Sequence, residues 1–518
     1  MAFQREVAPN LALADDGRIA ILRIRKSDRD KLEKHLFQRY PHREWGTFLR
    51  FGFRRTSWGL ALSYIDPMLP ELGDLDRQSD VTVFRDKYSL RAMRVAERSE
   101  VAVGVAHSHP VGFGTTASRL DDDMDSYFAR ELTAYSGGFP YVSLIFQRSD
   151  ETGFTFSGRV YDRGDWLPVT ILLTIGETVE KEFAENLAHV DDPVYDDLGT
   201  EQSTTARLDE LLGLPAARRL RNAVVGIVGC SGTGSPAVEV LARANVGGLV
   251  LVDPQRLAPS NVERVHGSVF DDINREPLPY KVEIQQRHIA AINPRARVTS
   301  LVGNVLHENV LDELLRCDIV MGCTDSVHGR VFLSDVAKHY LLPSIDVGVD
   351  MNGRHGKLSN QTADFTHYSP DLPCAFCNGL VNTAAMSIEL MTDEERRSRR
   401  AAAQEALERG DNPDHYWRGE RQLHTVGYLT SAVGSIAAGY VEGMLTGEFT
   451  MPHTAFQFDI GQPHFAVVPT LPLNADCSCH EHIGWADQAR SFRNVARPRH
   501  WPLRAVLLAR DEGAHRGR

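Results

Sequence analysis

The sequence predicts an α/β protein with two domains, the second of which is built on a mostly parallel sheet. At roughly 100–200 residues per domain, a length of 518 residues suggests two or three domains. From Asn222 onward, a buried apolar run, a glycine-rich turn, a helical stretch and a second apolar run, LVLVD, follow one another. This order is typical of a βαβ unit with parallel strands. Residues 1–165 instead carry short apolar runs separated by turns, which indicate strands.

An acidic, loop-like stretch, HVDDPVYDDLGTEQSTT, separates the two patterns. We therefore predict a first domain over residues 1–165, a linker over 166–205 and a second domain over 206–485. The arginine-rich residues 486–518 are predicted to form a tail. Within the second domain, Thr392 followed three residues later by a glutamate is a capping-box signature, which predicts a charged, solvated helix.

Composition and charge exclude several classes of protein. The net charge of -12 argues against a general nucleic-acid binder. No apolar stretch runs long enough to span a bilayer, so no membrane role is expected. The N-terminus lacks the basic-then-apolar pattern of a signal peptide, which makes the cytoplasm the expected compartment. Seven cysteines, an odd count in such a chain, do not indicate a disulfide framework.

A cluster of metal-ligating residue types follows the apolar run EVAVGVA in the first domain. His107 and His109 are two residues apart on a predicted strand, so their side chains point to the same side. With Asp121 they would supply three ligands and leave zinc one open position for water. Bound zinc lowers the pKa of that water to about 7, which makes hydroxide available as a nucleophile. The cluster predicts a catalytic zinc site; two incidental histidines on a strand are the alternative.

Two further residues would complete such a site. Glu44 lies just before the strand-like run GTFLRFGF, and a carboxylate near the water is the usual proton shuttle. Ser118 could steady the oxyanion that forms on the attacked carbonyl group. The other carboxylates nearby are expected to be solvated, with Asp122 a weaker alternative ligand.

These residues resemble the JAMM (MPN/JAB) zinc metalloprotease family, whose pattern is an upstream Glu followed by H-x-H-x7-S-x2-D. Every residue type is present in order, but eight residues separate His109 from Ser118, an extra residue that a loop can absorb. The resemblance implies an α/β metalloprotease domain in which His107, His109 and Asp121 hold zinc. It also implies that Glu44 is the general acid/base and that Ser118 supports the oxyanion. Family members cut isopeptide or peptide bonds after the C-terminal glycine of ubiquitin-like proteins.

The second domain opens on a glycine-rich turn formed by Gly229, Gly232 and Gly234. Glycine lets the backbone approach a phosphate closely, and the helix that follows supplies amide donors. Asp253 ends the next strand, 24 residues past Gly229, where an acid can hold ribose hydroxyls. By itself this device is just as typical of a dinucleotide site in a dehydrogenase.

Polar residues further along the chain favour a triphosphate over a dinucleotide. Arginine and lysine neutralise phosphate oxygens, and a carboxylate holds Mg²⁺. A hydride-transfer enzyme has no need of such a set. The sequence therefore predicts ATP and magnesium in the second domain. The residues in question are Asn261 and Arg264 in S-N-V-E-R, Lys281 in P-Y-K-V-E, and Asp325 at the end of C-T-D.

From about Arg207 to Pro463 these motifs resemble the ThiF/MoeB/ubiquitin-activating superfamily. The resemblance implies a Rossmann-like adenylation domain, in which the C-terminal carboxylate of a ubiquitin-like protein attacks the α-phosphate of ATP. The products are an acyl adenylate and pyrophosphate. Arg207 is a candidate for an additional arginine that the family supplies, and Ser231 stands where the family usually has glycine. By resemblance Asp253 binds ribose, Asn261, Arg264 and Lys281 bind phosphate, and Asp325 binds Mg²⁺.

Four cysteines fall in two close pairs, Cys374 with Cys377 and Cys477 with Cys479. Four thiolates can close a structural zinc site, and the superfamily has one built from two C-x-x-C pairs. The second pair here is C-x-C, so the fourth ligand stays open between cysteine and the neighbouring histidines, His480 and His482. Free buried cysteines are the alternative interpretation.

The segment between the two pairs contains no cysteine, and the other three cysteines are expected to be buried near strand ends. We therefore expect adenylation without a conventional thioester on this chain. An ester on a serine or threonine of residues 380–425 is an alternative that no motif supports. The adenylate would pass to a sulfur carrier, a conjugating enzyme or an amine.

Three functions are compatible with these motifs. The first is a bifunctional enzyme of a bacterial-style ubiquitin-like pathway, in which one domain cleaves the modifier and the other activates it. The second keeps this chemistry for sulfur-carrier activation in cofactor or cysteine biosynthesis. The third is a scaffold with one inactive domain, which the intact ligand sets argue against. The expected partners are a ubiquitin-like protein ending in glycine, a conjugating enzyme and, by resemblance, a second copy of the chain in a homodimer.

Overall fold

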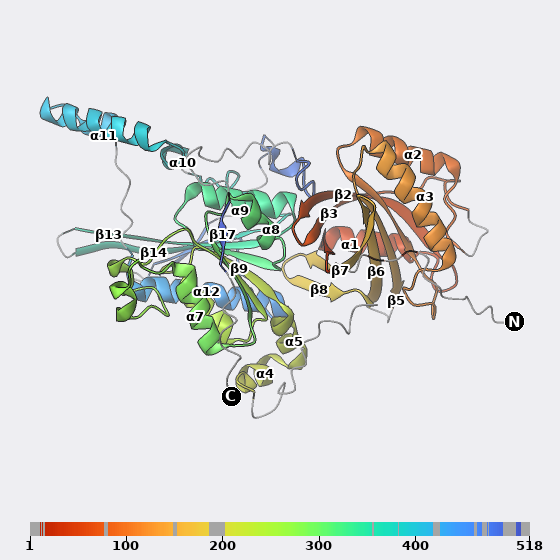
Figure 1. Ribbon diagram of the computed structural model, residues 1–518, viewed down its shortest axis with the longest axis horizontal. Coiled ribbons are helices and arrows are strands. Elements are labelled where there is room, and N and C mark those ends of the chain that lie inside the picture. Colours follow the sequence, from red (N-terminus) through yellow and green to blue (C-terminus); the bar gives the residue numbers. More distant parts are fainter. Residues whose placement is uncertain are drawn as a thin grey trace. The chain divides into compact units, whose positions relative to one another are not determined.

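The computed structural model describes residues 11, 13, 16–76, 81–148, 153–185, 203–354, 357–381, 383–417, 425–459, 464–468, 474, 476–489 and 504–508 (Figure 1). The described residues form two compact units. The first lies within residues 1–196 and includes the segments 338–342 and 478–493, and the second holds the remainder. Among the described helices, none is long and apolar enough to cross a bilayer.

The first unit is built on a sheet that closes on itself. The strands follow the order β1-β3-β2-β4-β5-β6-β7-β8, and β1 also pairs with β7 in parallel, which makes a barrel. Closure pairs β1 with β7, two strands that an open sheet would leave apart, and β8 stays as a short edge strand. The strands are β1 (Ile19–Arg25), β2 (Trp45–Thr56), β3 (Gly59–Met68), β4 (Ala102–Ser108), β5 (Tyr141–Arg148), β6 (Phe154–Asp162), β7 (Asp165–Ile175) and β8 (Val179–Phe183).

Helices cover the two faces of this sheet: α1 (Lys26–Leu36) on one, α2 (Asp86–Arg98) and α3 (Arg119–Tyr135) on the other. Each face has its own apolar core. Leu32 and Leu36 of α1 belong to one core, whereas Val103 and Val105 of β4 belong to the core beneath α2 and α3. Because side chains alternate along a strand, the next odd-numbered residue of β4, His107, also faces α3.

The predicted linker is partly wrong. Residues 166–185 hold most of β7 and all of β8, which belong to the first sheet. The apolar run WLPVTILLTI supplies the buried positions of β7, among them Val169 and Leu172. The acidic stretch from 186 to 202 lies outside the described residues.

The start of the predicted tail is also part of the fold. Ala486 pairs with Phe53 of β2, and the Gln488 side chain accepts a hydrogen bond from the Phe53 amide at 2.8 Å. A short strand, β17 (Val506–Leu507), pairs with an edge of the second sheet. Residues 490–503 and 509–518 of the predicted tail lie outside the described residues.

The second unit contains the predicted parallel sheet. Its order is β16-β15-β14-β13-β12-β9-β10-β11-β17, and the five central strands, β13 to β11 in that order, run parallel. Antiparallel strands extend both edges. The remaining strands are β9 (Val224–Val228), β10 (Gly248–Val252), β11 (Arg297–Val302), β12 (Ile319–Gly322), β13 (Ser344–Arg354), β14 (Lys357–Tyr368), β15 (Ala455–Asp459) and β16 (His464–Val468).

Helices lie on both faces of this sheet, with α8 and α9 on one side and α7 and α12 on the other (Figure 1). The predicted capping box is confirmed: the Thr392 side chain accepts from the Glu395 amide at the start of α11, and α11 projects away from the sheet (Figure 1). The helices are α4 (Ala206–Leu212), α5 (Leu214–Asn222), α6 (Gly234–Arg243), α7 (Lys281–Ile292), α8 (Glu308–Leu314), α9 (Val327–His339), α10 (Thr383–Glu389), α11 (Asp393–Glu408) and α12 (Gly427–Thr446).

Candidate functional site

A cavity of about 670 Å³ lies at the carboxyl ends of the parallel strands in the second unit. The chain runs from β9 outward through β10 to β11 and then returns to place β12 on the other side of β9. In sheets of this kind, ligands bind where the strand order reverses, because the two diverging connections leave a crevice there. Its volume falls in the range of roughly 300–1,000 Å³ typical of small-molecule sites.

Most residues predicted for the nucleotide site line this one cavity. Two do not. Arg207 is exposed on α4 and is not among the described lining residues. Gly234 lies behind the turn, where a Cβ atom would come within 1.8 Å of the Gly229 carbonyl oxygen, so glycine there permits close helix–strand packing. The predicted residues that line the cavity are Gly229, Gly232, Asp253, Asn261, Arg264, Lys281 and Asp325.

The glycine turn needs glycine at its first position for two reasons. Gly229 has a φ of 96°, a region that residues with a side chain rarely adopt. A Cβ atom at Gly229 would also lie 2.5 Å from the carbonyl oxygen of Cys323. The turn therefore packs directly against the C-T-D loop, which brings both motifs to the same cavity.

Asp253 holds the glycine turn and the loop after β10 together. Its carboxylate accepts hydrogen bonds from the amides of Cys230 at 2.9 Å and Gln255 at 2.8 Å. Burial raises the pKa of this carboxyl group above its ordinary value, although the charge of Lys281 and the two amides oppose the effect. Lys281 is only 3% exposed, and its ammonium group donates to the Gln255 side chain at 2.6 Å. A positive charge is thus held inside the cavity.

Sequence reasoning missed several lining residues, of which Arg256 and Arg330 carry a charge. The Arg330 guanidinium group lies 3.2 Å from the Asp346 carboxylate and donates to the Thr324 carbonyl oxygen at 3.2 Å. Its position could have indicated this role in the sequence: Arg330 follows Asp325 by five residues and lies in the first turn of the helix after the C-T-D motif. Asn304, after β11, also lines the cavity and belongs to no motif.

The predicted metal ligands of the first unit lie together at the end of β4. The Nε2 atoms of His107 and His109 are 3.3 Å apart, and the Asp121 carboxylate lies 3.2 Å from the first and 3.6 Å from the second. Zinc–nitrogen bonds of about 2.0–2.1 Å in a tetrahedron separate neighbouring ligand atoms by about 3.3 Å. The described ligand atoms fit that spacing. All three side chains are nearly fully buried.

Hydrogen bonds fix this triad of side chains. His109 Nδ1 lies 2.8 Å from the Gly114 carbonyl oxygen, so that nitrogen donates and Nε2 is left to bind a metal. Burial raises the pKa of Asp121, but the hydrogen bond and charge of His107 outweigh burial and hold that pKa well below its ordinary value. The donor set suits a divalent cation.

The other predicted members of the centre have distinct places. Glu44 immediately precedes Trp45, which pairs with Ser108 across β2 and β4, and the Thr82 amide donates to its carboxylate at 2.9 Å. Ser118 begins α3 as its N-cap, and its hydroxyl accepts from the Asp121 amide at 3.3 Å. That capping role is one the sequence analysis did not assign to it.

The neighbouring acids are not all solvated, contrary to the sequence analysis. Asp122 and Asp125 are buried and both pair with Arg159, at 2.6 Å in each case. Asp122 therefore pairs with Arg159, and Asp121 is the acid of this helix turn that approaches the histidines.

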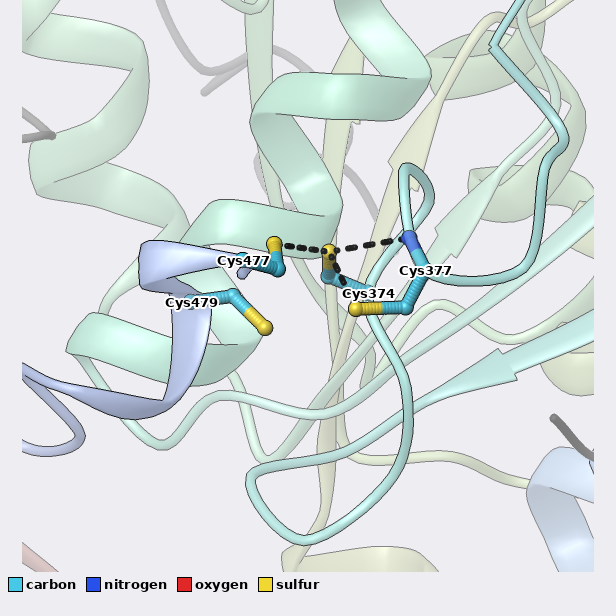
Figure 2. Close-up of side chains that lie close together, drawn as sticks. All are labelled: Cys374, Cys377, Cys477 and Cys479. Carbon is cyan, nitrogen blue, oxygen red and sulfur yellow. Dashed lines mark hydrogen bonds between the residues drawn. The ribbon is translucent and has the colours of Figure 1, made fainter. Parts of the chain in front are cut away.

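The four paired cysteines come together in one cluster. Figure 2 shows their sulfur atoms turned toward a common centre, and all four lie within 4.8 Å of one another. The Sγ atom of Cys374 lies 3.6 Å from those of Cys377 and Cys477. Zinc–sulfur bonds of about 2.3 Å in a tetrahedron would separate the sulfurs by about 3.8 Å. The cluster therefore has the spacing of a structural zinc site, with Cys479 as its fourth thiol.

The fold and the cavity define a doubly wound α/β protein with a ligand site at its topological switch point. The ThiF family model matches residues 203–480, more than half of the chain. The chain belongs to the ThiF family. The match does not extend to the described residues of the first sheet.

Curated relatives match parts of the chain. The adenylyltransferase and sulfurtransferase UBA4 of Kluyveromyces lactis is 32% identical over 130 residues, which cover 25% of this chain and 28% of the relative. The sulfur carrier protein ThiS adenylyltransferase of Escherichia coli is 33% identical over 24% of this chain and 47% of its own length. The SAMP-activating enzyme E1 of Haloferax volcanii is 29% identical over a match that covers 33% of this chain and 58% of the relative. The matches thus span between about a quarter and three fifths of these relatives.

Among solved structures, E. coli MccB with ATP is 16% identical, with a TM-score of 0.40 over 54% of this chain and 74% of that chain.

Proposed function

We propose that the second unit uses ATP and Mg²⁺ to adenylate the C-terminal carboxylate of a ubiquitin-like or sulfur-carrier protein. The observation that carries this proposal is the single cavity lined by Asp253, Lys281 and Asp325 together with the glycine turn. Two of the curated relatives are named adenylyltransferases and a third is named an activating enzyme, which supports the same reaction class.

Each lining residue has a task that its position suits. Asp253, fixed by two amides, would hold the ribose hydroxyls. Asn261, Arg264 and Lys281 would hold phosphate oxygens, and Asp325 would hold Mg²⁺. The carboxylate of the partner protein attacks the α-phosphorus, the bond to the bridging oxygen breaks, and pyrophosphate leaves. Cationic groups fixed before the reaction stabilise the charge that develops on the phosphates.

The activated carboxyl group could serve protein conjugation or sulfur transfer. The matched relatives include a sulfur carrier protein adenylyltransferase and a SAMP-activating enzyme E1. We favour conjugation, through a conjugating enzyme or directly to an amine, because the same chain carries a candidate peptidase centre that would act on the same terminus. We also propose a homodimer through the second unit. Arg207 is exposed on α4, away from the cavity of its own subunit, and it could complete the cavity of a second copy.

ATP–pyrophosphate exchange tests the adenylation directly. A panel of purified ubiquitin-like and sulfur-carrier proteins ending in Gly-Gly is offered to the chain with Mg·ATP. At least one should support exchange, and the same protein without its terminal glycine should not. Exchange that persists in Asp325→Ala would contradict the assignment. Mass spectrometry of the products then separates an amide conjugate from a thiocarboxylate.

We propose a second activity for the first unit: a zinc-dependent peptidase that cleaves after the C-terminal glycine of the same class of partner. The spacing of 3.2–3.6 Å among the ligand atoms of His107, His109 and Asp121 favours it. Bound zinc would supply a Lewis acid that polarises the scissile carbonyl and acidifies water. Glu44, oriented by the Thr82 amide, would accept and return the proton.

Cleavage of a ubiquitin-like protein extended beyond its terminal glycine tests this second activity. Glu44→Gln should abolish cleavage while zinc content stays at the wild-type level, because Glu44 is not a ligand. His109→Ala should abolish cleavage and also remove the zinc ion of this triad. Cleavage by zinc-free protein would rule the peptidase out. We further propose that Cys374, Cys377, Cys477 and Cys479 hold a structural zinc ion, since their sulfur spacing fits it.

A further inference from the structure

The connection between β14 and α12 reaches back to the nucleotide cavity through one side chain. Glu389, the last residue of α10, accepts three hydrogen bonds from the start of α9. They come from the Ser326 hydroxyl at 2.8 Å, the Val327 amide at 2.8 Å and the His328 amide at 3.0 Å. No motif marked Glu389, because its partners lie more than sixty residues earlier in the chain.

These contacts satisfy groups that the helix cannot satisfy itself. The first amides of an α-helix have no intrahelical acceptor, and their partial positive charge favours a nearby carboxylate. Glu389 caps two of these amides of α9. The Ser326 hydroxyl, which donates to Glu389, also accepts from the Gly329 amide at 3.0 Å. The first turn of α9 is thus organised by a carboxylate from a distant segment.

The proposed magnesium ligand lies on the loop that leads directly into this turn. Asp325 and Ser326 are consecutive and both line the cavity, as does Arg330 one turn later. Arg330 fixes the same loop from the other side through the Thr324 carbonyl oxygen. The loop that presents Asp325 is therefore held between Arg330 and Glu389.

Glu389 is itself held in place by α11. The Arg396 guanidinium group donates to the carbonyl oxygens of Ile388 and Glu389, at 3.2 Å in both cases. Arg396 lies in the first turn of α11, which Thr392 caps. The helix that projects from the sheet in Figure 1 is therefore connected to the Asp325 loop through two side chains.

We propose that Glu389 is a positioning residue for adenylation: it docks the β14–α12 connection onto α9 and thereby sets Asp325 for Mg·ATP. The inference rests on the proposed adenylation. Glu389 does not touch the nucleotide; it acts through Ser326 and the α9 amides. If the β14–α12 connection were released from α9, the cavity would keep its lining residues, but Asp325 would no longer be held in position for Mg²⁺.

The test measures Mg²⁺ dependence. In Glu389→Gln, which keeps the side-chain size but loses the charge and one acceptor oxygen, the Mg²⁺ concentration for half-maximal Mg·ATP binding by calorimetry should rise about tenfold. Glu394→Gln, an exposed acid in the first turn of α11, is the matched control and should behave like the wild type. Ser326→Ala removes one of the three contacts from the other side and should raise the Mg²⁺ requirement by a smaller factor.

The possible outcomes distinguish a failure of the positioning role of Glu389 from a failure of the proposed adenylation. A wild-type chain that does not bind Mg·ATP at any Mg²⁺ concentration overturns both. A wild-type chain that binds Mg·ATP, with Glu389→Gln indistinguishable from Glu394→Gln, overturns the positioning role alone. A general loss of fold would lower the fraction of binding-competent protein without changing its Mg²⁺ midpoint, so an unchanged midpoint in both Glu389→Gln and Ser326→Ala also overturns it.

Discussion

Replacing Lys281 by methionine removes one positive charge from the nucleotide cavity while it keeps most of the length of the side chain. The side chain is 3% exposed, and the carboxylate of Asp253 is close enough to be influenced by its charge. The charge is therefore held where water screens it weakly, and a phosphate that enters the cavity would replace the lost hydration of the ammonium group.

The expected magnitude follows from this burial. Two unit charges 4 Å apart attract by about 4 kcal/mol at an effective dielectric constant of about 20. Removing one preorganised donor from a site where charge develops costs about 2.7–4 kcal/mol in known cases. Lys281→Met should therefore lower the rate of ATP–pyrophosphate exchange roughly 100- to 1,000-fold.

The assay compares exchange rates at saturating Gly-Gly partner protein, with Lys357→Met as the control. Lys357 is exposed at the start of β14 and is not among the residues that line the cavity. Its replacement should leave exchange unchanged. If Lys281→Met lowers the exchange rate less than threefold while its melting temperature matches the wild type, the Lys281 charge does not act on ATP.

Two other predictions concern the metals and the pH dependence. Elemental mass spectrometry should find two zinc ions in the chain. His109→Ala and Cys377→Ser should each lose one zinc ion, and the double variant should lose both. If either single variant loses both zinc ions, the two centres are not independent. Burial lowers the pKa of His367 from 6.5 to about 4, so the stability it contributes is fully present above pH 6.5 and is lost progressively as the pH falls from 6.5 through about 4. That shift is worth about 3 kcal/mol, so His367→Leu should flatten the fall in melting temperature between pH 6.5 and 4.5. His415→Leu, at an exposed site, should leave this fall in melting temperature unchanged. If the melting temperatures of the wild type and both variants fall equally with pH, His367 is not the group responsible.

The position of the nucleotide motifs could be predicted because the parallel topology brings the ends of these strands to one edge of the sheet. Gly229, Asp253 and Asp325 each follow a strand of one parallel sheet, so they must emerge at the same edge. Arg330 and Glu389 could not be found this way. Arg330 is a helix residue without a motif, and Glu389 reaches its partners only through a tertiary contact.

The first unit shows the same limit of local patterns. His107 lies on β4 and His109 directly follows its last residue, so their spacing of two gives them a common direction. Asp121 meets them because α3 packs on that face of the sheet. The parallel pairing of β1 with β7 joins residues about 150 positions apart, and no local pattern predicts it. The predicted linker begins too early, because the run of acidic residues that follows Phe183 in the sequence is more conspicuous than a short strand such as β8.

Adenylation by the second unit is tested by trapping the product in the cavity. The chain is incubated with Mg·ATP and a Gly-Gly partner that supports exchange, and the bound nucleotide is identified by mass spectrometry and by crystallography of the complex. We expect AMP joined to the partner's terminal glycine, with its ribose on Asp253 and its phosphate beside Lys281. A dinucleotide over the glycine turn, or an intact partner with no adenylate while ATP is hydrolysed, would contradict it.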